Sequence, residues 1–259
     1  MNPPCYVTTS WDDGHPLDWR IAGLLERYAM PGTFYIPRRS QRPVLDPGGV
    51  RALAQSFDIG AHTLTHPILT SLPLAAAASE IGGSRRYIED ATGRACFLFA
   101  PPGGKYWAAH LGIAQRAGFR GVRTTELLYS GFPRRRGGLV VMPTTMQVYA
   151  HPGVRYIRNA LKRARFANLA AYFRHVGGAS LTAAFTQLIE AAIQSGGVLH
   201  LWGHSWEIEE RGAWNALETM LASLAERREC LRPISNASLC DGVLCDGYTT
   251  SPSSTLALP

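Results

Sequence analysis

The sequence predicts an α/β fold, in which helices surround a parallel β-sheet that is closed or nearly closed into a barrel. Short apolar, β-prone runs alternate with longer amphipathic segments from one end of the chain to the other. Polar residues follow several of these runs directly, where the chemistry of such folds is found. The length of 259 residues and the 46% apolar content suit one globular domain, which we expect to span residues 1–248.

The individual elements follow from this alternation. The expected strands cover 6–10, 33–36, 58–61, 96–100, 121–124, 139–143 and 198–202, and the expected helices cover 17–28, 49–57, 74–92, 108–117, 155–173, 182–195 and 213–228. Segment 147–178 is rich in arginine and aromatic residues and interrupts the rhythm, so we interpret it as an inserted substrate lid. Residues 249–259 consist mainly of Ser, Thr and Pro, and we expect them to form a disordered tail.

Charge and cysteine content narrow the class of protein. The net charge is +7, and basic residues cluster at 134–136 and 155–165. Such a cluster suits nucleic acid, an anionic membrane or an acidic substrate, and equally a solvated helix face. No apolar run is long enough to span a membrane, and no basic segment leads into an apolar stretch at the N-terminus. We therefore expect a cytoplasmic protein whose five scattered cysteines are reduced thiols.

The polar residues that follow the predicted strands form the candidate site. Asp12 and Asp13 follow the first strand, His62 and His66 follow the third, and His200 and His204 lie on or just after the last. Parallel strands end at one rim, so these side chains are expected to meet there. Two neighbouring carboxylates repel one another, and burying both without a cation is costly.

These residues predict a metal centre. Histidines four residues apart face the same side of one helical turn, and with one aspartate they make three ligands that leave positions open for water and substrate. The second aspartate is then free to act as a base. The alternative interpretation of Asp12-Asp13-Gly14 is a simple turn that caps the following helix. We expect zinc, although another divalent metal would suit the same ligands.

Three motifs resemble those of the polysaccharide deacetylase family, which shares the NodB homology domain. Thr9-Ser10-Trp11-Asp12-Asp13-Gly14 resembles its Thr-Phe-Asp-Asp-Gly motif, and His62-Thr63-Leu64-Thr65-His66-Pro67 resembles its His-Ser/Thr-x-x-His-Pro motif. Gly196-Gly197-Val198-Leu199-His200 is similar to its final Leu-His strand. The resemblance implies a distorted (β/α) barrel and metal-dependent N-deacetylation of N-acetylglucosamine-type sugars. It implies that Asp12 is the general base, that Asp13, His62 and His66 bind the metal, and that His200 is the general acid.

Two departures from the family pattern affect these roles. The family's Arg-Pro-Pro-Tyr-Gly motif corresponds to Ala100-Pro101-Pro102-Gly103-Gly104, so the arginine that holds the catalytic aspartate is missing. Lys105 or an arginine such as Arg123 is the expected replacement. The last motif carries an additional histidine, His204, with the same strand parity as His200. Either histidine can be the acid, with His200 preferred because Leu199 precedes it.

Further residues near the rim are candidates for substrate binding. Aromatic rings can stack on sugars, and a backbone N–H near Gly103 can stabilise an oxyanion. The candidate set is Trp11, Pro102, Gly103, Tyr106, Trp107, Arg123, Trp202 and Trp206.

The predicted function is the hydrolysis of the N-acetyl group of an N-acetylglucosamine-type sugar. A soluble glycoconjugate or secondary metabolite is the expected substrate, as for the deacetylases of teicoplanin-type glycopeptide-antibiotic biosynthesis, and no nucleic-acid partner is expected. Two alternatives stay open. One is a family hydrolase acting on a non-sugar amide, as allantoinase-like enzymes do. The other is a non-catalytic module that binds carbohydrate or nucleic acid.

Overall fold

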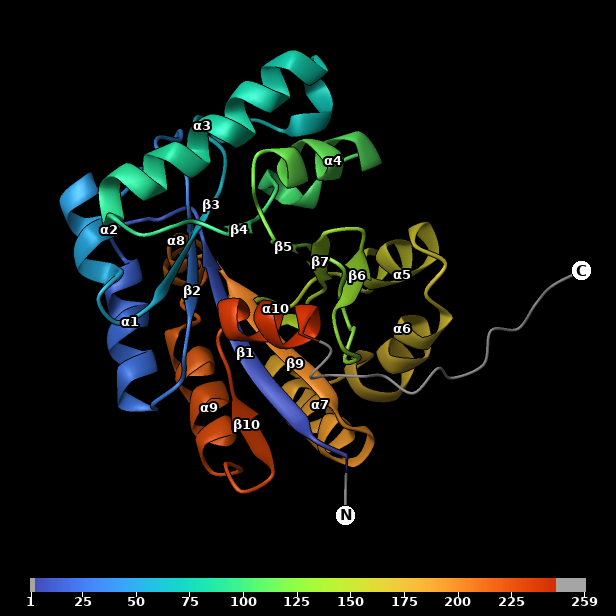
Figure 1. Ribbon diagram of the computed structural model, residues 1–259. Coiled ribbons are helices and arrows are strands. Elements are labelled where there is room, and N and C mark those ends of the chain that lie inside the picture. The colour runs from blue at the N-terminus through green and yellow to red at the C-terminus, as the bar shows by residue number, and fades with distance from the viewer. Residues whose placement is uncertain (1–2, 246–259) are drawn as a thin grey trace, which may run out of the picture.

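The centre of the fold is one curled sheet of ten strands (Figure 1). The computed structural model of the protein describes residues 3–245. The strand order is β6-β7-β5-β4-β3-β2-β1-β9-β8, with β10 also paired to β1, and every pairing is parallel except that of β6 with β7. Within the described residues the end strands β6 and β8 do not pair, so the barrel is open. The strands are β1 (Cys5–Asp12), β2 (Thr33–Ile36), β3 (Asp58–Ala61), β4 (Leu98–Phe99), β5 (Gly121–Arg123), β6 (Arg134–Arg136), β7 (Leu139–Met142), β8 (Met146–Gln147), β9 (Gly197–Gly203) and β10 (Leu231–Pro233).

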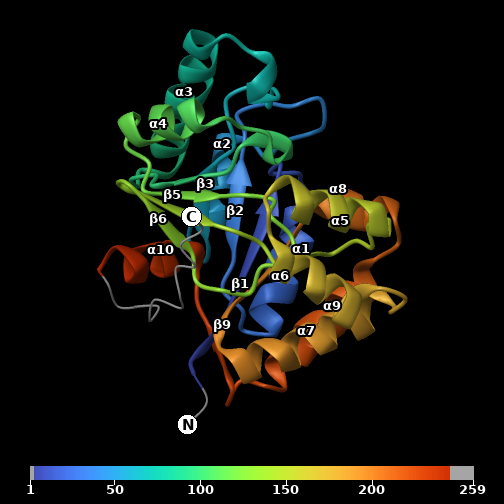
Figure 2. The ribbon, with the colours of Figure 1, turned by 90° about the vertical axis from the view of Figure 1, so that its right-hand side faces the viewer.

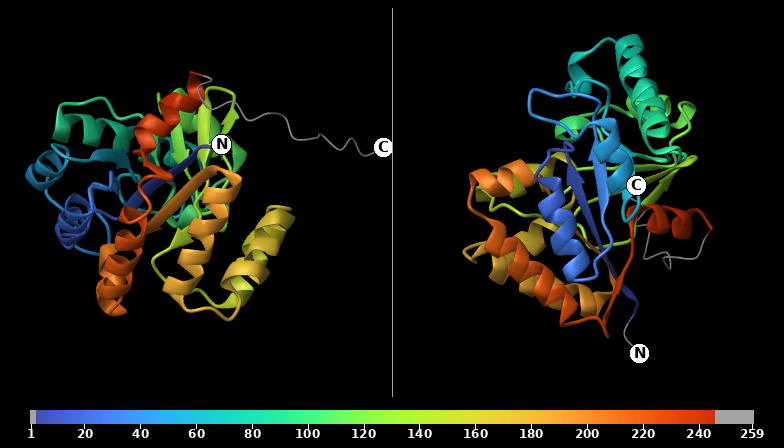
Figure 3. Two further views of the ribbon diagram at one scale, coloured as in Figure 1. Left: turned by 90° about the horizontal axis from the view of Figure 1, so that it is seen from below. Right: turned by 90° about the vertical axis from the view of Figure 1, so that its left-hand side faces the viewer.

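Helices surround the curled sheet, as the turned views show (Figures 2 and 3). The α-helices are α1 (Asp18–Arg27), α2 (Pro47–Leu53), α3 (Leu74–Thr92), α4 (Ala108–Arg116), α5 (Gly153–Lys162), α6 (Phe166–Ala171), α7 (Leu181–Ser195), α8 (Ser205–Glu210), α9 (Trp214–Ala225) and α10 (Asn236–Leu244). Three short non-α helices are η1 (Leu69–Ser71), η2 (Pro102–Gly104) and η3 (Tyr172–Val176), the last a π-helix.

Alternation along the strands separates two apolar clusters. Phe34, Phe99 and Leu199 belong to the larger cluster under the outer helices. Their strand neighbours Tyr35, Leu98 and Val198 belong to a smaller cluster that also contains Leu239 and Cys240 of α10. Successive side chains of a strand point to opposite faces, so the second cluster is the inside of the half-barrel, covered by α10. Asp12, Arg123 and His200 follow the inner parity, which directs polar groups into the barrel.

All seven predicted strands and six of the seven predicted helices are present in the predicted order. The predicted helix 155–173 is wrong as a single helix. It is broken at residues 163–165, where Ala164 adopts a left-handed φ of 51°, and it continues as α6 and η3. Five elements were not predicted, namely β6, β8, β10, α8 and α10, and most of them are too short for a clear apolar period.

The single domain over residues 1–248 stays a prediction. The lid role of segment 147–178, which comprises the end of β8, α5, α6 and η3, also stays a prediction. The predicted tail lies outside the described residues. No helix within residues 3–245 has the length and apolar character that crossing a membrane requires.

Candidate metal centre and active site

The two aspartates after β1 point in different directions because of the backbone between them. Asp13 has a φ of 79°, in the left-handed region that aspartate tolerates better than most residues. Gly14 follows with a φ of 62°, and a Cβ there would lie 2.6 Å from Ile36 Cγ2. Only glycine therefore fits this turn. As a result Asp12 contacts Arg123 inside the barrel, whereas Asp13 contacts the two histidines.

Asp13, His62 and His66 form the candidate metal centre. Asp13 Oδ1 lies 3.4 Å from His62 Nε2 and 3.0 Å from His66 Nε2, and the three ligand atoms lie within 4.8 Å of one another. His62 Nδ1 donates to the Ala100 carbonyl at 2.7 Å, which leaves Nε2 for a metal. Although burial opposes it, the interaction with the two histidine side chains holds the pKa of Asp13 well below its usual range. Within the described residues Asp13 Oδ1 is buried and has no hydrogen-bond partner, so the donor set fits a divalent cation.

The two histidines are brought together by a turn, which corrects the helical turn that the sequence predicted. Thr63 and His66 both have left-handed φ values, 66° and 58°. The Thr63 hydroxyl accepts from the His66 backbone N–H at 3.1 Å. The Glu80 carboxylate of α3 accepts from the backbone N–H groups of Leu64 and Thr65, each at 2.8 Å, and from the Thr65 hydroxyl at 2.7 Å. Glu80 thus holds the whole turn, a role that the sequence alone did not reveal.

We expect Glu80→Ala to weaken metal binding by about 10- to 100-fold, as loss of an outer contact to metal ligands does. The substitution leaves two backbone donors of the turn without their acceptor, so His66 loses its fixed position. Isothermal titration with zinc measures the affinity. Glu89→Ala, on the same helix, is the matched control and should keep the affinity. Equal affinity in both variants would contradict the role given to Glu80.

Arg123 lies beside Asp12, where the family's Arg-Pro-Pro-Tyr-Gly motif would supply the arginine that is missing at Ala100. Its guanidinium pairs with Asp12 Oδ1, and both side chains are buried. The guanidinium lies 5.1 Å from the ring centroids of both Tyr35 and Trp202, so two aromatic rings contribute cation–π contacts to it. Of the two replacements that the sequence allowed, Lys105 is exposed and Arg123 reaches the aspartate.

The structure separates the two candidate acids. His200 is buried, and its Nδ1 donates to the Pro143 carbonyl at 3.1 Å. Since a carbonyl only accepts, His200 Nε2 is left as the acceptor for the Ser10 hydroxyl at 2.9 Å. Burial, together with the charge of Arg123, lowers the pKa of His200 to about 3. His200 is therefore hydrogen-bonded through both ring nitrogens in the barrel interior, an arrangement that favours His204 over it as the candidate acid.

His204 lies at the rim instead. Its Nε2 is 3.9 Å from Asp12 Oδ2, and its Nδ1 donates to Glu207 Oε2 at 3.1 Å. Gln147 Nε2 and Arg211 also bond to this carboxylate. Burial acts to lower the pKa of His204, but the carboxylates of Glu207, Asp13 and Asp12 outweigh it and raise that pKa above its usual range. Glu207, three residues after His204, was missed as a partner even though its spacing was visible in the sequence.

The predicted substrate-binding residues do not all reach the surface. Trp11 is completely buried in the outer core, so its predicted stacking on a sugar is wrong. Pro102 and Trp202 are also buried, Trp202 against Arg123 and His204. Gly103 is exposed, Tyr106 is half-buried, and Trp107 is 53% exposed and stacks on His110 at 5.3 Å. These three stay candidates for contact with substrate.

Trp206 contacts the candidate metal centre and also lines a cleft. Its Nε1 donates to Asp13 Oδ2 at 2.8 Å, and the Arg42 guanidinium lies 3.5 Å from its ring centroid. A cleft of about 510 Å³ opens here. It is lined by Asp13, Ser40, Gln41, Arg42, Thr65, His66, Pro67, Ile68 and Trp206. A molecule bound in this cleft would lie directly beside Asp13 and His66 of the candidate metal centre.

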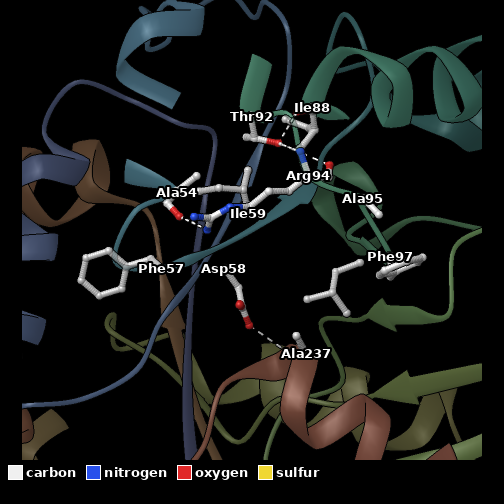
Figure 4. Close-up of a pocket in the computed structure, with 11 residues that line it drawn as sticks. Ala54, Phe57, Asp58, Ile59, Ile88, Thr92, Arg94, Ala95, Phe97 and Ala237 are labelled. Atoms are coloured by element: carbon white, nitrogen blue, oxygen red, sulfur yellow. Dashed lines mark hydrogen bonds between the residues drawn. The ribbon is translucent and has the colours of Figure 1, made fainter. Parts of the chain in front are cut away.

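A second hollow lies at the other end of the strands, where β3 and β4 begin (Figure 4). Asp58 there accepts from the Ala237 backbone N–H at 3.2 Å, and Arg94 donates to the Ala54 carbonyl. Its two charged side chains are thus engaged in holding the fold. The candidate functional site is therefore the cleft beside Trp206, at the carboxyl ends of the strands.

Comparison with known proteins finds a family whose model matches the N-terminal part of the chain. The family model described as polysaccharide deacetylase matches residues 2–122, which include Asp12, Asp13, His62 and His66. This part of the chain, somewhat less than half of it, is therefore similar to the polysaccharide deacetylase family. No curated protein matches the sequence.

Solved structures share the fold at low sequence identity. A Mycobacterium smegmatis protein assigned to the polysaccharide deacetylases is 15% identical, with a TM-score of 0.67 over 100% of this chain and 96% of that one. A family 4 carbohydrate esterase from Streptomyces lividans, in complex with acetate, is 19% identical, with a TM-score of 0.55 over 88% and 91%. A family 4 pseudoenzyme from Bacillus anthracis is 16% identical, with a TM-score of 0.54 over 93% and 67%. The half-barrel thus matches the deacetylase barrel predicted from the sequence.

Proposed function

We propose that this protein is a zinc-dependent N-deacetylase that hydrolyses the acetamide of an N-acetylglucosamine-type sugar. One observation carries the proposal: the Asp13–His62–His66 ligand set lies next to an Arg123-held aspartate and a Glu207-held histidine at one rim. Three N and O ligands with open positions suit catalytic zinc, although the same set accepts other divalent metals. A bound cation would polarise the acetyl carbonyl and acidify a water molecule.

The side chains divide the proton transfers between them. Asp12 accepts the proton of the attacking water, and the pairing with Arg123 fixes the orientation of its carboxylate. His204 donates a proton to the departing amine, because its Nε2 faces Asp12 across the rim while Glu207 holds its Nδ1. Without that proton the amine is a poor leaving group. A backbone N–H near Gly103 is the proposed further donor to the developing oxyanion.

The substrate is proposed to be a glycoconjugate whose N-acetylated sugar enters the cleft beside Trp206. The aromatic rings of Tyr106, Trp107 and Trp206 are the proposed contacts for the sugar and its aglycone. A secondary metabolite such as a glycopeptide antibiotic stays part of this proposal. Segment 147–178 is proposed to influence which aglycone is accepted.

The family 4 pseudoenzyme among the similar structures makes a non-catalytic role the main alternative. The missing motif arginine at Ala100 pointed the same way. The pairing of Arg123 with Asp12 favours catalysis, because Arg123 supplies the arginine–aspartate contact that the missing motif arginine would otherwise make.

Acetate release tests the proposal. Zinc-loaded protein is incubated with N-acetylglucosaminyl conjugates that carry sugar, peptide or lipid aglycones, and with allantoin as a non-sugar amide. Release of acetate from the sugars, without hydrolytic ring opening of allantoin, supports the proposal. Turnover of allantoin alone, or binding of the sugars without any turnover, would reject it.

A matched pair of variants tests the choice of general acid. We expect His204→Gln to lower kcat by roughly 10²- to 10⁴-fold, the usual contribution of a positioned acid. His200→Gln should instead lower the melting temperature, because His200 bonds to Ser10 and Pro143 in the interior. Glu207→Gln removes a charge that raises the pKa of His204, so the alkaline limb of kcat should move to lower pH. If the His200→Gln variant keeps its melting temperature and loses kcat, then His200, and not His204, is the general acid.

A further inference from the structure

The positive charge of the protein comes from one stretch of the chain. Between Glu126 and Glu190 there is no acidic residue, whereas the same stretch contains nine lysines and arginines. The rest of the chain holds 17 basic and 19 acidic residues, so the net charge of +7 arises entirely from this stretch. Arg134 and Arg165 pair with Glu126 at its border. Exposed basic side chains on the helical part are Arg155, Arg158, Lys162 and Arg174.

The same helices expose large apolar side chains. Val154 and Leu161 of α5 are 62% and 56% exposed, and Phe166 of α6 and Phe173 of η3 are 73% and 66% exposed. Residues seven apart return to the same side of a helix, so Val154 and Leu161 share one side of α5. A single exposed apolar residue needs no explanation, but four within residues 154–173 indicate an interaction surface.

This surface is firmly held by the opposite sides of the helices. Tyr156 and Ala160 of α5 are buried, and the Tyr156 ring stacks on that of Tyr172 at 5.5 Å. Asn159 donates to the Thr125 carbonyl and accepts from the Leu127 backbone N–H. Asn168 of α6 donates to the Leu127 carbonyl. Since the inner sides are used, the exposed sides of α5 and α6 face outward at the flank of the molecule (Figures 1 and 2).

We propose that this flank docks on an anionic lipid bilayer. The lipid-facing surface is formed by Val154, Leu161, Phe166 and Phe173 together with Arg155, Arg158, Lys162 and Arg174. A basic amphipathic helix with aromatic residues lies in the bilayer interface, where its apolar side chains enter the acyl boundary and its cations meet the headgroups. A nucleic acid would use the positive charges but would leave the bulky apolar side chains without a partner. The bilayer is the partner that uses both.

Vesicle co-sedimentation of the full chain tests this proposal, and it does not depend on catalytic activity. The two vesicle types are phosphatidylcholine alone and an equal mixture of phosphatidylcholine and phosphatidylglycerol. The protein should bind the mixed vesicles, and added salt should weaken binding. Phe166→Ser combined with Phe173→Ser should lower the partition coefficient by about tenfold or more. Arg158→Glu should lower it by at least about fivefold.

Matched controls separate the surface from the overall charge. Leu74→Ser removes an apolar side chain of α3 that is 48% exposed, and Arg116→Glu reverses an exposed charge of α4. Both should bind the mixed vesicles like the unaltered protein, and circular dichroism verifies that every variant is folded. The proposal fails if the controls weaken binding as much as the surface variants do. It also fails if the protein prefers duplex DNA to the vesicles, or if the phenylalanine variants only shift a monomer–dimer equilibrium in analytical ultracentrifugation.

Discussion

Replacing His66 with alanine is expected to abolish stoichiometric metal binding and, with it, acetate release. The reason is the small number of ligands: Asp13 and His62 would remain, and two protein ligands rarely hold a catalytic metal. His66 is also the most exposed of the three ligands, with 29% of its side chain accessible, so its removal disturbs the core least. Elemental analysis after dialysis against zinc measures the occupancy.

A control histidine outside the site makes the His66 result interpretable. His175→Ala alters a half-buried histidine of η3 and should retain one metal per chain. If the protein with His66→Ala keeps full metal occupancy, the ligand set assigned here is wrong. If it loses the metal while acetate release persists, the proposed metal dependence is wrong although the site is real.

Replacing Asp12 with asparagine is expected to lower kcat by roughly 10²- to 10⁴-fold while zinc stays bound, because the side chain keeps its shape and loses its basicity. The same change leaves the buried Arg123 without its counter-charge. Loss of one partner of a buried pair costs about 3–5 kcal/mol of unfolding free energy, so the melting temperature should fall as well.

A double variant separates chemistry from stability. Asp12→Asn combined with Arg123→Met removes both charges, and replacement of a buried pair by uncharged groups is often close to neutral in stability. We expect the melting temperature to recover in the double variant while kcat stays low. Recovery of both would show that Asp12 acts only through the fold. Loss of zinc from a folded Asp12→Asn protein would exchange the roles of Asp12 and Asp13.

The sequence by itself determined the order of the principal strands and helices and the residues of the candidate metal-ligand set. Asp13, His62 and His66 could be found because they follow predicted strands, and parallel strands end at one rim. This inference needed only local periodicity and the chain order. The resemblance of the two motifs to those of the polysaccharide deacetylases added the expected roles, and the family model matches the part of the chain that contains them.

Only the tertiary structure decided which polar groups meet across the barrel. Asp12 and Arg123 are 111 residues apart, and sequence spacing cannot show that both point inward. The contrast between His200 and His204 is similar: both have the same strand parity, but His200 faces the buried Ser10 and Pro143, whereas His204 comes just after β9 ends at the rim. Trp11 was misjudged for the same reason, because burial depends on the helices that cover the sheet. Local pattern specifies the elements, and long-range packing selects the side chains that solvent and substrate reach.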